Sequence, residues 1–431
     1  MSEQANIKRL GDVIASGSYG VLPPGDSYLE SGGVRFLRPT EMRPNNEVVW
    51  NSCLRAPLEF SKKTRARLKN GDVLIAVKGA TIASEKSVCV IRDLSEPTIV
   101  NGSIFHFQPI EDVSSEYLLN VLSSDFAKKQ MKQGLILNNA VDYLSRTIID
   151  DFLIPIPTLE TQRALVTKME VARTARQQKL DEAETLLAGI DDFVLEQLGL
   201  EMPVGETELS FAITQADLAK RLDTYFYKPH LREAENRVLS FKPETKKLSQ
   251  LLASPPQNGV DARKYLSSGQ KYLRVQNIRP FDIILDNAAY VESENKKDIA
   301  LREGDVLLTR KGTFGTAALV TEESTNCLIS SEIILLRLSE NSNCSPEYLV
   351  AWLNSRIGQM LFDRYKSGAI MGHITQNVVK NFPIPIASTQ IQEKIADEIQ
   401  SRRSKALQLR KEAETLWQEA KGAFEKALLG E

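Results

Sequence analysis

The sequence predicts an α+β protein, in which two mixed α/β domains are separated by two long antiparallel coiled-coil helices with an internal pseudo-two-fold repeat. Three observations support this fold class. In residues 158–200 and 387–431, apolar residues recur mostly in steps of three and four, with a break at Arg176 in the first stretch, as in long amphipathic helices. Short β-like runs separated by Gly, Pro, Asn and Asp precede each stretch. The same motifs occur twice in the same order, which is typical of an internal repeat.

Residues 1–157 are expected to form the first mixed domain. Its β-like runs cover residues 34–37, 73–77, 87–91 and 104–107, where apolar and β-branched residues dominate. A helical stretch follows at 116–132. The run FLIPIP then leads into the first long helix, and its two prolines require an extended chain at that point.

The first long helix is expected within residues 158–202. Thr158 is a suitable N-cap, and Gly189 is the one internal residue that disfavours a helix. A helix of about 40 residues is roughly 60 Å long, so its apolar stripe needs a partner along much of its length. The stripe consists of Leu165, Met169, Ala172, Leu180, Ala183, Leu187, Ile190, Val194 and Leu198.

The second mixed domain is expected at residues 203–386, and the second long helix at 387–431. In that helix, Thr389 and Gln392 fit a capping box. We expect the two long helices to pair antiparallel, each covering the stripe of the other. The second stripe consists of Ile391, Ile395, Ile399, Ala406, Leu409, Ala413, Leu416, Ala420, Phe424 and Leu428.

The repeat covers both the domains and the helices. Residues 34–44 resemble 270–280, and residues 68–79 resemble 301–312. At the helix entries, Pro155-Ile156-Pro157 resembles Pro383-Ile384-Pro385, and Gln162 resembles Gln390. Along the helix entries and the helices, the offset between the copies runs from 228 (Pro155 to Pro383) to 231 (Leu198 to Leu429). The two halves therefore diverged from one plan with few insertions.

Composition and missing motifs argue against an autonomous enzyme. Net charge is −2, and the four cysteines show no paired metal spacing, as expected for a reduced cytosolic protein. No apolar run reaches the roughly 18 residues of a membrane span. The sequence has no phosphate-binding GxxxxGK[ST] loop, no GxSxG elbow and no Asn/Asp-Pro-Pro-Tyr/Phe tetrad of amino-methyltransferases. We therefore expect no catalytic residue, no metal site and no cofactor site in this chain.

The ordered, duplicated layout resembles the specificity (S) subunit of Type I restriction-modification systems, the HsdS family. The resemblance rests on the paired Gly-Asp-Val-Leu motifs at 71–74 and 304–307, the Pro-Ile-Pro entries and the Gln helix starts. Residues 221–229 also resemble the segment that opens a half in many members. That segment has no counterpart before the first domain. The first half also lacks the second glycine of the Lys311-Gly312-Thr313-Phe314-Gly315 loop, so we expect a different loop shape at Lys78-Gly79.

The resemblance implies a non-catalytic, cytoplasmic subunit of a bacterial or archaeal complex. In that family, two target-recognition domains each read one half of a split double-stranded DNA target. The helices hold two methyltransferase (modification) subunits, and two restriction (motor-nuclease) subunits complete the nuclease. S-adenosylmethionine, ATP and Mg would therefore bind to partner subunits, and no membrane is involved.

Polar residues at the ends of the apolar runs are the candidates for DNA contact. Arginine can bind guanine with two hydrogen bonds, and Asn or Gln can do the same for adenine. Lys and Arg beside glycine suit a phosphate, because glycine lets the backbone approach closely. The alternative is ordinary surface polarity at solvated strand ends. The candidates are Arg38, Arg43, Lys78, Arg274, Gln276, Asn277, Arg279, Arg310, Lys311 and Thr313.

Several alternatives remain at this point. The Gly-Asp pairs are interpreted as turns into buried strands rather than as DNA contacts. The glycine loops at 133–139 and 367–373 either pack internally or touch DNA through their apolar residues. The helices either set the distance between two DNA-reading domains or only join them. The whole chain could instead be a coiled-coil scaffold with two protein-binding domains, or a solitary methyltransferase.

Overall fold

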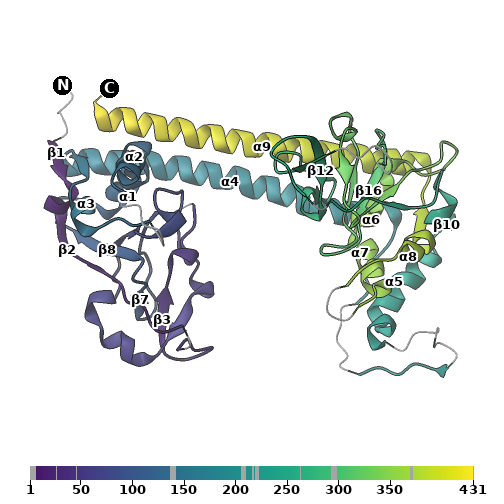
Figure 1. The fold of residues 1–431 in the computed structure, drawn as a ribbon, viewed down its shortest axis with the longest axis horizontal. Coiled ribbons are helices and arrows are strands. Elements are labelled where there is room, and N and C mark those ends of the chain that lie inside the picture. Colours follow the sequence, from purple (N-terminus) through teal and green to yellow (C-terminus); the bar gives the residue numbers. More distant parts are fainter. Residues whose placement is uncertain are drawn as a thin grey trace. The chain divides into compact units, whose positions relative to one another are not determined.

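The computed structural model describes residues 6–25, 27–44, 46–135, 142–204, 210–215, 218, 223–262, 264–292, 299–368 and 372–430. The chain forms two compact units (Figure 1). Unit 1 contains residues 1–181 and 409–431, and unit 2 contains residues 182–408. Each unit therefore holds one mixed domain and a part of both long helices. We describe each unit by itself.

Unit 1 is built on a four-stranded and a three-stranded sheet. The first has the order β2 (Ile14–Tyr19), β8 (Ile104–Pro109), β5 (Val73–Ala76), β6 (Val88–Val90), and the second has the order β4 (Leu54–Ala56), β3 (Val34–Leu37), β7 (Thr98–Val100). The four predicted β-like runs correspond to β3, β5, β6 and β8. Helices α1 (Ser115–Ser123), α2 (Asp125–Gln133) and α3 (Arg146–Asp150) follow. Side chains of α1 and α2 share one buried cluster with β5, β6 and β8.

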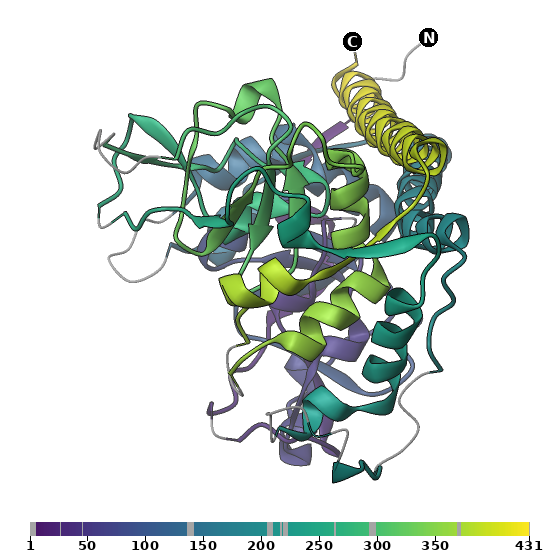
Figure 2. The ribbon, with the colours of Figure 1, turned by 90° about the vertical axis from the view of Figure 1, so that its right-hand side faces the viewer.

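Unit 2 repeats this plan. Its four-stranded sheet has the order β11 (Gln257–Asn258), β19 (Ile333–Leu336), β16 (Val306–Thr309), β17 (Ala317–Leu319), and its three-stranded sheet has the order β15 (Ala289–Val291), β12 (Gln270–Leu273), β18 (Leu328–Ile329). The hairpin of β13 (Ile278–Arg279) and β14 (Asp282–Ile283) follows β12. Helices α6 (Pro346–Asn354), α7 (Arg356–Tyr365) and α8 (Gln376–Asn381), drawn in yellow-green in Figure 2, follow the strands in the same order as α1, α2 and α3 do in unit 1.

The Gly-Asp pairs have the structural role expected of them. Gly71 and Gly304 both have positive φ, of 87° and 84°, which glycine adopts without strain. The buried Asp72 and Asp305 carboxylates accept hydrogen bonds from the backbone of Lys69 and Arg302, at 2.9 and 2.7 Å. Each pair therefore closes the turn that starts the central strand, β5 or β16.

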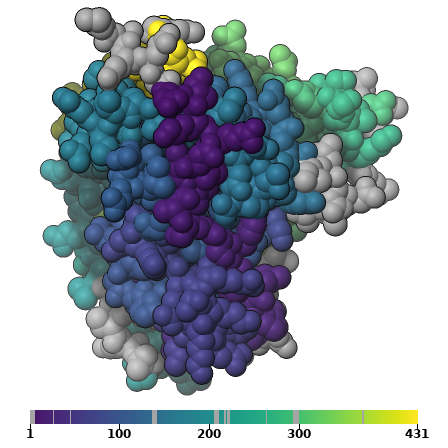
Figure 3. Space-filling view, turned by 90° about the vertical axis from the view of Figure 1, so that its left-hand side faces the viewer, coloured from purple at the N-terminus to yellow at the C-terminus, as the bar shows by residue number. Residues whose placement is uncertain are grey.

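A two-stranded sheet in each unit leads into a long helix. In unit 1, β1 (Asn6–Arg9) pairs antiparallel with β9 (Leu153–Ile156) and lies at the surface (Figure 3). In unit 2, β10 (Glu244–Lys247) pairs with β20 (Pro383–Ile386). The Tyr117 and Tyr348 hydroxyls donate hydrogen bonds to the carbonyls of Pro155 and Pro385, both at 2.6 Å.

These contacts correct the alignment of the two helix entries. Pro155 is equivalent to Pro385, so the offset here is 230 rather than the 228 that relates it to Pro383. The error arose because proline and isoleucine alternate in this segment, so a shift of two residues preserves both the sequence pattern and the strand face. The hydrogen bonds of Tyr117 and Tyr348 therefore determine an alignment of the two segments that the sequence pattern alone does not determine.

The long helices are α4 (Leu159–Leu198) and α9 (Thr389–Leu429), with 40 and 41 residues. They pair antiparallel within each unit. In unit 1, Lys179 Nζ lies 2.7 Å from Glu412 Oε2. In unit 2, Arg402 Nη1 donates to the Gly189 carbonyl at 2.6 Å. A side chain at position 189 would place its Cβ 2.8 Å from that guanidinium, so glycine permits this close approach without ending the helix.

Two details of the helical predictions were wrong. The expected helix at 116–132 is divided into α1 and α2, because Ser124 ends the first and its hydroxyl accepts a hydrogen bond from Ala127 to cap the second. In the second stripe, Leu416 is 36% exposed, whereas Trp417 is only 9% exposed. The period of 3.6 residues carries the buried face from Ala413 to Trp417 rather than to Leu416.

A buried glutamine attaches each mixed domain to the start of its long helix. The Gln162 side chain accepts a hydrogen bond from Ser114 N and donates to the carbonyls of Asp112 and Pro157, at 2.9, 3.0 and 2.9 Å. The Gln392 side chain does the same with Ser345 N, Asn343 O and Ala387 O, at 2.9, 2.7 and 2.9 Å.

Gln162 is therefore equivalent to Gln392 and not to Gln390. The helix caps agree, because the Thr158 and Ser388 hydroxyls each accept a hydrogen bond from the residue three positions on, at 3.4 Å. Thr158 was predicted as a cap. The predicted capping box of Thr389 with Gln392 was wrong, because α9 already begins at Thr389 and the Gln392 side chain reaches out to the mixed domain.

Among the described residues, the segment that contains helix α5 in unit 2 has no counterpart in unit 1. Helix α5 (Pro229–Leu239) follows a short turn that Asp223 caps, and the Tyr225 hydroxyl bonds to Asp363 of α7 at 2.5 Å. This segment belongs to the stretch 221–229 that singled out the second half in the sequence. Arg221 and Leu222 lie outside the described residues, as do 136–141 and 369–371 of the two glycine loops.

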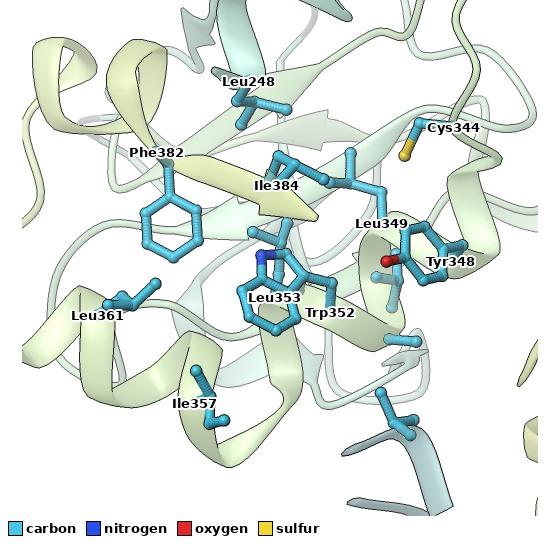
Figure 4. Close-up of a cluster of buried hydrophobic side chains, with 14 of the residues drawn as sticks. Leu248, Cys344, Tyr348, Leu349, Trp352, Leu353, Ile357, Leu361, Phe382 and Ile384 are labelled. Atoms are coloured by element: carbon cyan, nitrogen blue, oxygen red, sulfur yellow. The ribbon is translucent and has the colours of Figure 1, made fainter. Parts of the chain in front are cut away.

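The core of unit 2 centres on Trp352 (Figure 4). Trp352 and Leu353 of α6 are fully buried with Ile357 and Leu361 of α7. The Trp352 indole nitrogen donates to the Pro383 carbonyl at 3.0 Å, so its one polar group is satisfied. The same cluster takes in the end of α4 and the start of α9. The long helices therefore complete the core of the domain beside them.

Replacing either buried glutamine should loosen the unit that contains it. Gln392→Ala leaves one amide and two carbonyls without their partner, so we expect the free energy of local opening in unit 2 to fall by about 2–4 kcal/mol. Gln162→Ala should do the same in unit 1. The exposed Gln390→Ala is the matched control and should change it by less than about 0.5 kcal/mol. Hydrogen exchange of the α6 and α1 amides measures the free energy of local opening in the two units. Equal effects of all three substitutions would contradict the role of the buried glutamines in holding each mixed domain to its long helix.

Candidate nucleic-acid interface

Two predicted loops of unit 2 meet at the ends of β12 and β16. The segment that follows β18 joins them, because Ser330 N donates to the Leu273 carbonyl and Arg310 N donates to the Glu332 carbonyl, both at 2.9 Å. A Cβ on Gly312 would lie 3.6 Å from Val275 Cγ1, so the two turns touch. The structure thus brings together candidates that lie some 35 positions apart in the sequence, on the turns 274–277 and 310–313.

Three polar atoms in this cluster are buried without a hydrogen-bond partner. They are Arg274 Nε, Arg310 Nε and Ser330 Oγ, and the described residues contain only three other such side-chain atoms. The Arg274 guanidinium carbon lies 5.3 Å from the centroid of the Tyr265 ring. A buried polar group without a partner costs about 1–3 kcal/mol. Such a concentration indicates a site whose acceptors come from a ligand.

The sequence did not point to Ser330 or Tyr265. The signal that could have found Ser330 is its position, because Ser330 and Ser331 directly follow the apolar run Cys327–Ile329 and end a buried strand. Tyr265 carries no such signal, because it lies in an irregular segment before β12 and approaches Arg274 only in the folded chain.

Asn277 should be removed from the candidates for base contact. It is fully buried. Its Oδ1 accepts a hydrogen bond from Arg274 N at 2.9 Å, and its Nδ2 donates to Ile284 O and Asn287 Oδ1 at 3.0 and 2.8 Å. Both ends of the amide are therefore used to hold the turn that presents Arg274. Gln276 is exposed on the same turn and keeps its amide available.

The remaining candidates of unit 2 lie at the surface. Lys311 and Thr313 are exposed, and Lys311 Nζ lies 3.9 Å from Glu332 Oε1, a loose pair with both side chains about half exposed. Arg279 is also exposed, but it lies on the β13–β14 hairpin, opposite Asp282. The structure therefore places Arg279 on a different element from the cluster with unpaired donors.

Unit 1 has the same frame with different side chains. Arg38 corresponds to Arg274, and Glu41 takes the place of Asn277 as the buried cap of the turn. The Glu41 carboxylate accepts from Arg38 N and Arg38 Nη2, both at 2.7 Å, and this hydrogen bond raises the pKa of Arg38. Arg38 is therefore held by its own chain.

The other basic positions of unit 1 also differ. Val77 N donates to the Ser103 carbonyl at 2.9 Å, so the buried Val77 takes the place of Arg310. Lys78 and Arg43 are exposed, and Arg43 N donates to the Glu47 carbonyl in the hairpin that corresponds to β13–β14. The expected difference in loop shape is confirmed, because Gly79–Thr81 forms a 3-10 turn and Ala83, not glycine, has positive φ near its end.

The described residues contain no group of three or more His, Cys, Asp and Glu that could hold a metal ion. Burial raises the pKa of Cys89 and Cys344 to about 12, so these thiols stay protonated and unreactive near neutral pH. A search of the same residues for a helix long and apolar enough to span a membrane finds none.

Comparison with known families agrees with the duplicated frame. A model of the Type I restriction modification DNA specificity domain matches residues 2–184 and 245–414, one match for each mixed domain with the start of its long helix. The chain belongs to this family of Type I DNA specificity domains. Membership of this family gives the chain a role in DNA sequence specificity.

Individual relatives are distant. The Type I restriction enzyme MjaVIII specificity subunit of Methanocaldococcus jannaschii is 23% identical over 126 residues, which is 29% of this chain and 29% of that protein. A chain in the structure "Structural basis underlying complex assembly and conformational transition of the type I R-M system" is 17% identical, with a TM-score of 0.56 over 99% of this chain and 98% of that one. That likeness shows a shared fold. A Type-I S subunit from M. genitalium, at 12% identity and a TM-score of 0.47 over 99% and 97% of the chains, carries no further weight.

Within this specificity-domain chain, Ser330→Ala should stabilise the ligand-free protein. It removes a buried hydroxyl that has no partner, so we expect unit 2 to gain about 1 kcal/mol of unfolding free energy. Ser355→Ala is the matched control, because Ser355 is equally buried but its hydroxyl accepts from Gly358 N at 3.1 Å. That variant should lose about 1 kcal/mol. Urea unfolding of both variants tests the assignment, and a destabilised Ser330→Ala protein would contradict it.

Proposed function

We propose that this chain is the DNA sequence-specificity subunit of a Type I restriction-modification complex and reads a bipartite, asymmetric target in double-stranded DNA. The single observation that carries the proposal is the cluster of unpaired donors at Arg274, Arg310 and Ser330. Arg274 and Arg310 are partly exposed, and DNA supplies acceptors for their guanidinium groups as phosphate oxygens or as guanine O6 and N7. The duplicated frame supports one half-site for each mixed domain.

The proposed DNA contacts are of two kinds, to phosphates and to bases, and the residues assigned to each differ in exposure and geometry. Lys311 in unit 2 and Lys78 in unit 1 are exposed beside a glycine of positive φ, at Gly312 and Gly79, which suits phosphate binding. Arg274, Arg310 and Gln276 have the planar, paired donors that distinguish bases in the major groove. Thr313 is exposed on the same turn. Arg43 and Arg279 are assigned to flanking DNA from the neighbouring hairpins.

The asymmetry of the target follows from the differences between the units. Glu41 holds the Arg38 guanidinium in unit 1, whereas Asn277 bonds only the backbone nitrogen of Arg274, and Arg274 Nε has no hydrogen-bond partner. Unit 1 also has Val77 where unit 2 has Arg310. Two turns with the same backbone but different free donors would select different bases.

The proposed subunit has no catalysis of its own. Two methyltransferase subunits would bind its helices, and two restriction subunits would complete the nuclease, with S-adenosylmethionine, ATP and Mg bound to those partners. Support comes from the family match and from the repeated frame, in which Gln162 and Gln392 fix each mixed domain to its long helix in the same way. Methylome sequencing of cells with and without this chain tests the whole proposal, and a methylation pattern that does not depend on the chain would overturn it.

A non-DNA scaffold is the main alternative. It would bind proteins through the same mixed domains, and its assembled complex would show no preference among DNA sequences. Sequence-selective binding to duplex DNA that weakens as salt rises would exclude it, because phosphate contacts release counterions.

Two substitutions should separate base reading from phosphate binding. Gln276→Ala should relax one position in one half-site, with a loss of about 1–3 kcal/mol of discrimination there. Lys311→Gln should weaken binding to all sequences alike and reduce the slope of log affinity against log salt by about 1. Fluorescence anisotropy with randomised half-sites measures both effects. If Gln276→Ala altered both half-sites, the assignment of one half-site to unit 2 would be wrong.

We also propose that α4 and α9 set the number of unread base pairs. Inserting seven residues in each helix, after Asp181 and after Gln408, keeps the apolar stripes in phase and lengthens each helix by about 10 Å. The unread gap should then grow by about three base pairs, since ten base pairs span about 34 Å. Methylome sequencing shows the gap directly. An insertion in α4 alone is the control and should abolish recognition, because the stripes no longer match.

A further inference from the structure

An arginine in unit 1 fills a site that is open in unit 2. Arg92 forms two hydrogen bonds with Glu116 at the start of α1: Nε to Oε1 at 2.7 Å, and Nη2 to Oε2. Two residues of α4 lie beside this pair. Burial lowers the pKa of Arg173, and the neighbouring Arg92 guanidinium lowers it further. Glu170 is close enough to contribute to the raised pKa of Arg92.

Strand register identifies the equivalent residues of unit 2. Val73 pairs with Val90 as Val306 pairs with Leu319, so Arg92 corresponds to Thr321. Ser114 caps the helix of Tyr117 as Ser345 caps that of Tyr348, so Glu116 corresponds to Glu347. Through the offset of 230 between the long helices, Glu170 and Arg173 correspond to Gln400 and Arg403.

The counterparts of the Arg92 neighbours now line a cavity of about 360 Å³. Glu347, Gln400 and Arg403 contribute to its wall, together with Phe281, Leu319 and Val350. Thr321 has no guanidinium to offer, and within the described residues Glu347 has no ion-pair partner. The change from Arg92 to Thr321 therefore removes the partner that Glu116 has in unit 1, and the cavity lies beside the carboxylate left without it.

The charges of the cavity favour a cation. Glu347 and Asp397 both line it. Its one arginine, Arg403, is already paired with Asp282 and lies over the Phe281 ring, 5.8 Å from the centroid. Leu319 and Val350 provide an apolar wall. An arginine side chain fits these features, because its methylene stem packs on apolar surface while the guanidinium binds a carboxylate with two parallel hydrogen bonds.

The backbone beside the cavity is strained. Phe281 has a φ of 69°, and the equivalent Asn46 in unit 1 has a φ of 64°. Asparagine tolerates this conformation, whereas a bulky aromatic residue rarely adopts it. Strain of this kind persists where the surrounding structure fixes a functional geometry. Here it holds the Phe281 ring in the wall of the cavity, where Arg403 already lies over it.

We propose that this cavity of unit 2 binds an arginine side chain of a partner protein, whose guanidinium pairs with Glu347 as Arg92 pairs with Glu116. The proposal rests on the comparison of the two units and not on DNA recognition. Only unit 2 would bind a partner's arginine in this way, because in unit 1 Arg92 of the same chain already pairs with the equivalent carboxylate.

Methyl NMR of the full-length chain tests the cavity directly. The probe is N-acetyl-arginine-methylamide, added up to about 10 mM because a single side chain binds in the millimolar range. The methyl groups of Leu319, Val350 and Ile399, which line the cavity, should shift in a saturable way. N-acetyl-citrulline-methylamide has the same shape without the charge and should shift them little. Equal shifts with both probes, or no shift, would overturn the proposal.

Variants make the same test specific. Glu347→Gln should weaken binding of the arginine probe roughly 10-fold or more, the effect of losing a charged hydrogen-bond partner. Thr321→Arg should fill the cavity from within and prevent the shifts. Glu292→Gln, which changes an exposed carboxylate outside the cavity, is the control and should bind the probe as the wild type does. Unchanged binding by Glu347→Gln would contradict the assigned pairing.

A second measurement addresses the partner. The proteins that copurify with the wild-type chain are titrated against purified Thr321→Arg and Thr321→Ser variants in the absence of DNA. Thr321→Arg should weaken one of them roughly 10- to 100-fold, and Thr321→Ser should not. If every partner bound Thr321→Arg with unchanged affinity, docking through this cavity would be refuted. DNA reading would be unaffected by that outcome, because neither experiment contains DNA.

Discussion

Each half of this molecule depends on a glutamine side chain buried at the start of a long helix. Gln162 and Gln392 each make three hydrogen bonds, two of them to the loop that begins the first helix of the mixed domain. A buried amide with all its groups satisfied has one orientation, so it fixes the domain against the helix. The apolar stripes of α4 and α9 supply the association energy. Lys179 with Glu412 and Arg402 with the Gly189 carbonyl add polar contacts between the two helices, whereas each glutamine fixes its own helix to the mixed domain beside it.

The sequence predicted most of the frame but not its polar details. Apolar periodicity was sufficient for the strands β3, β5, β6 and β8 and for both long helices, because burial of one face dominates their free energy. It could not determine the register of the Pro-Ile-Pro segment, since alternation is unchanged by a shift of two. It also missed the break at Ser124 and the exposure of Leu416. At the candidate site, residue type was sufficient to select Arg274 and Arg310. Ser330 was not selected, because only the folded chain brings its segment next to these two arginines.

The two units keep the same backbone and differ where side chains meet the surface. The turn after the first strand of the three-stranded sheet is capped by a buried side chain in both, Glu41 or Asn277. Because one cap is charged and the other neutral, only Glu41 forms an ion pair with the arginine at the start of its turn. A single substitution at a buried cap thus changes the availability of a surface group without changing the fold.

A consistent pattern follows from this difference. At the equivalent positions, unit 1 pairs its charges within the chain, as Arg38 with Glu41 and Arg92 with Glu116. Unit 2 leaves Arg274, Arg310 and Glu347 without those partners. The buried Nε atoms of Arg274 and Arg310 lower stability because they lack a partner, whereas the exposed Glu347 carboxylate is solvated. At these positions unit 2, and not unit 1, has the polar groups without those partners in its own chain, and our proposals of DNA reading and of partner docking both rest on these groups.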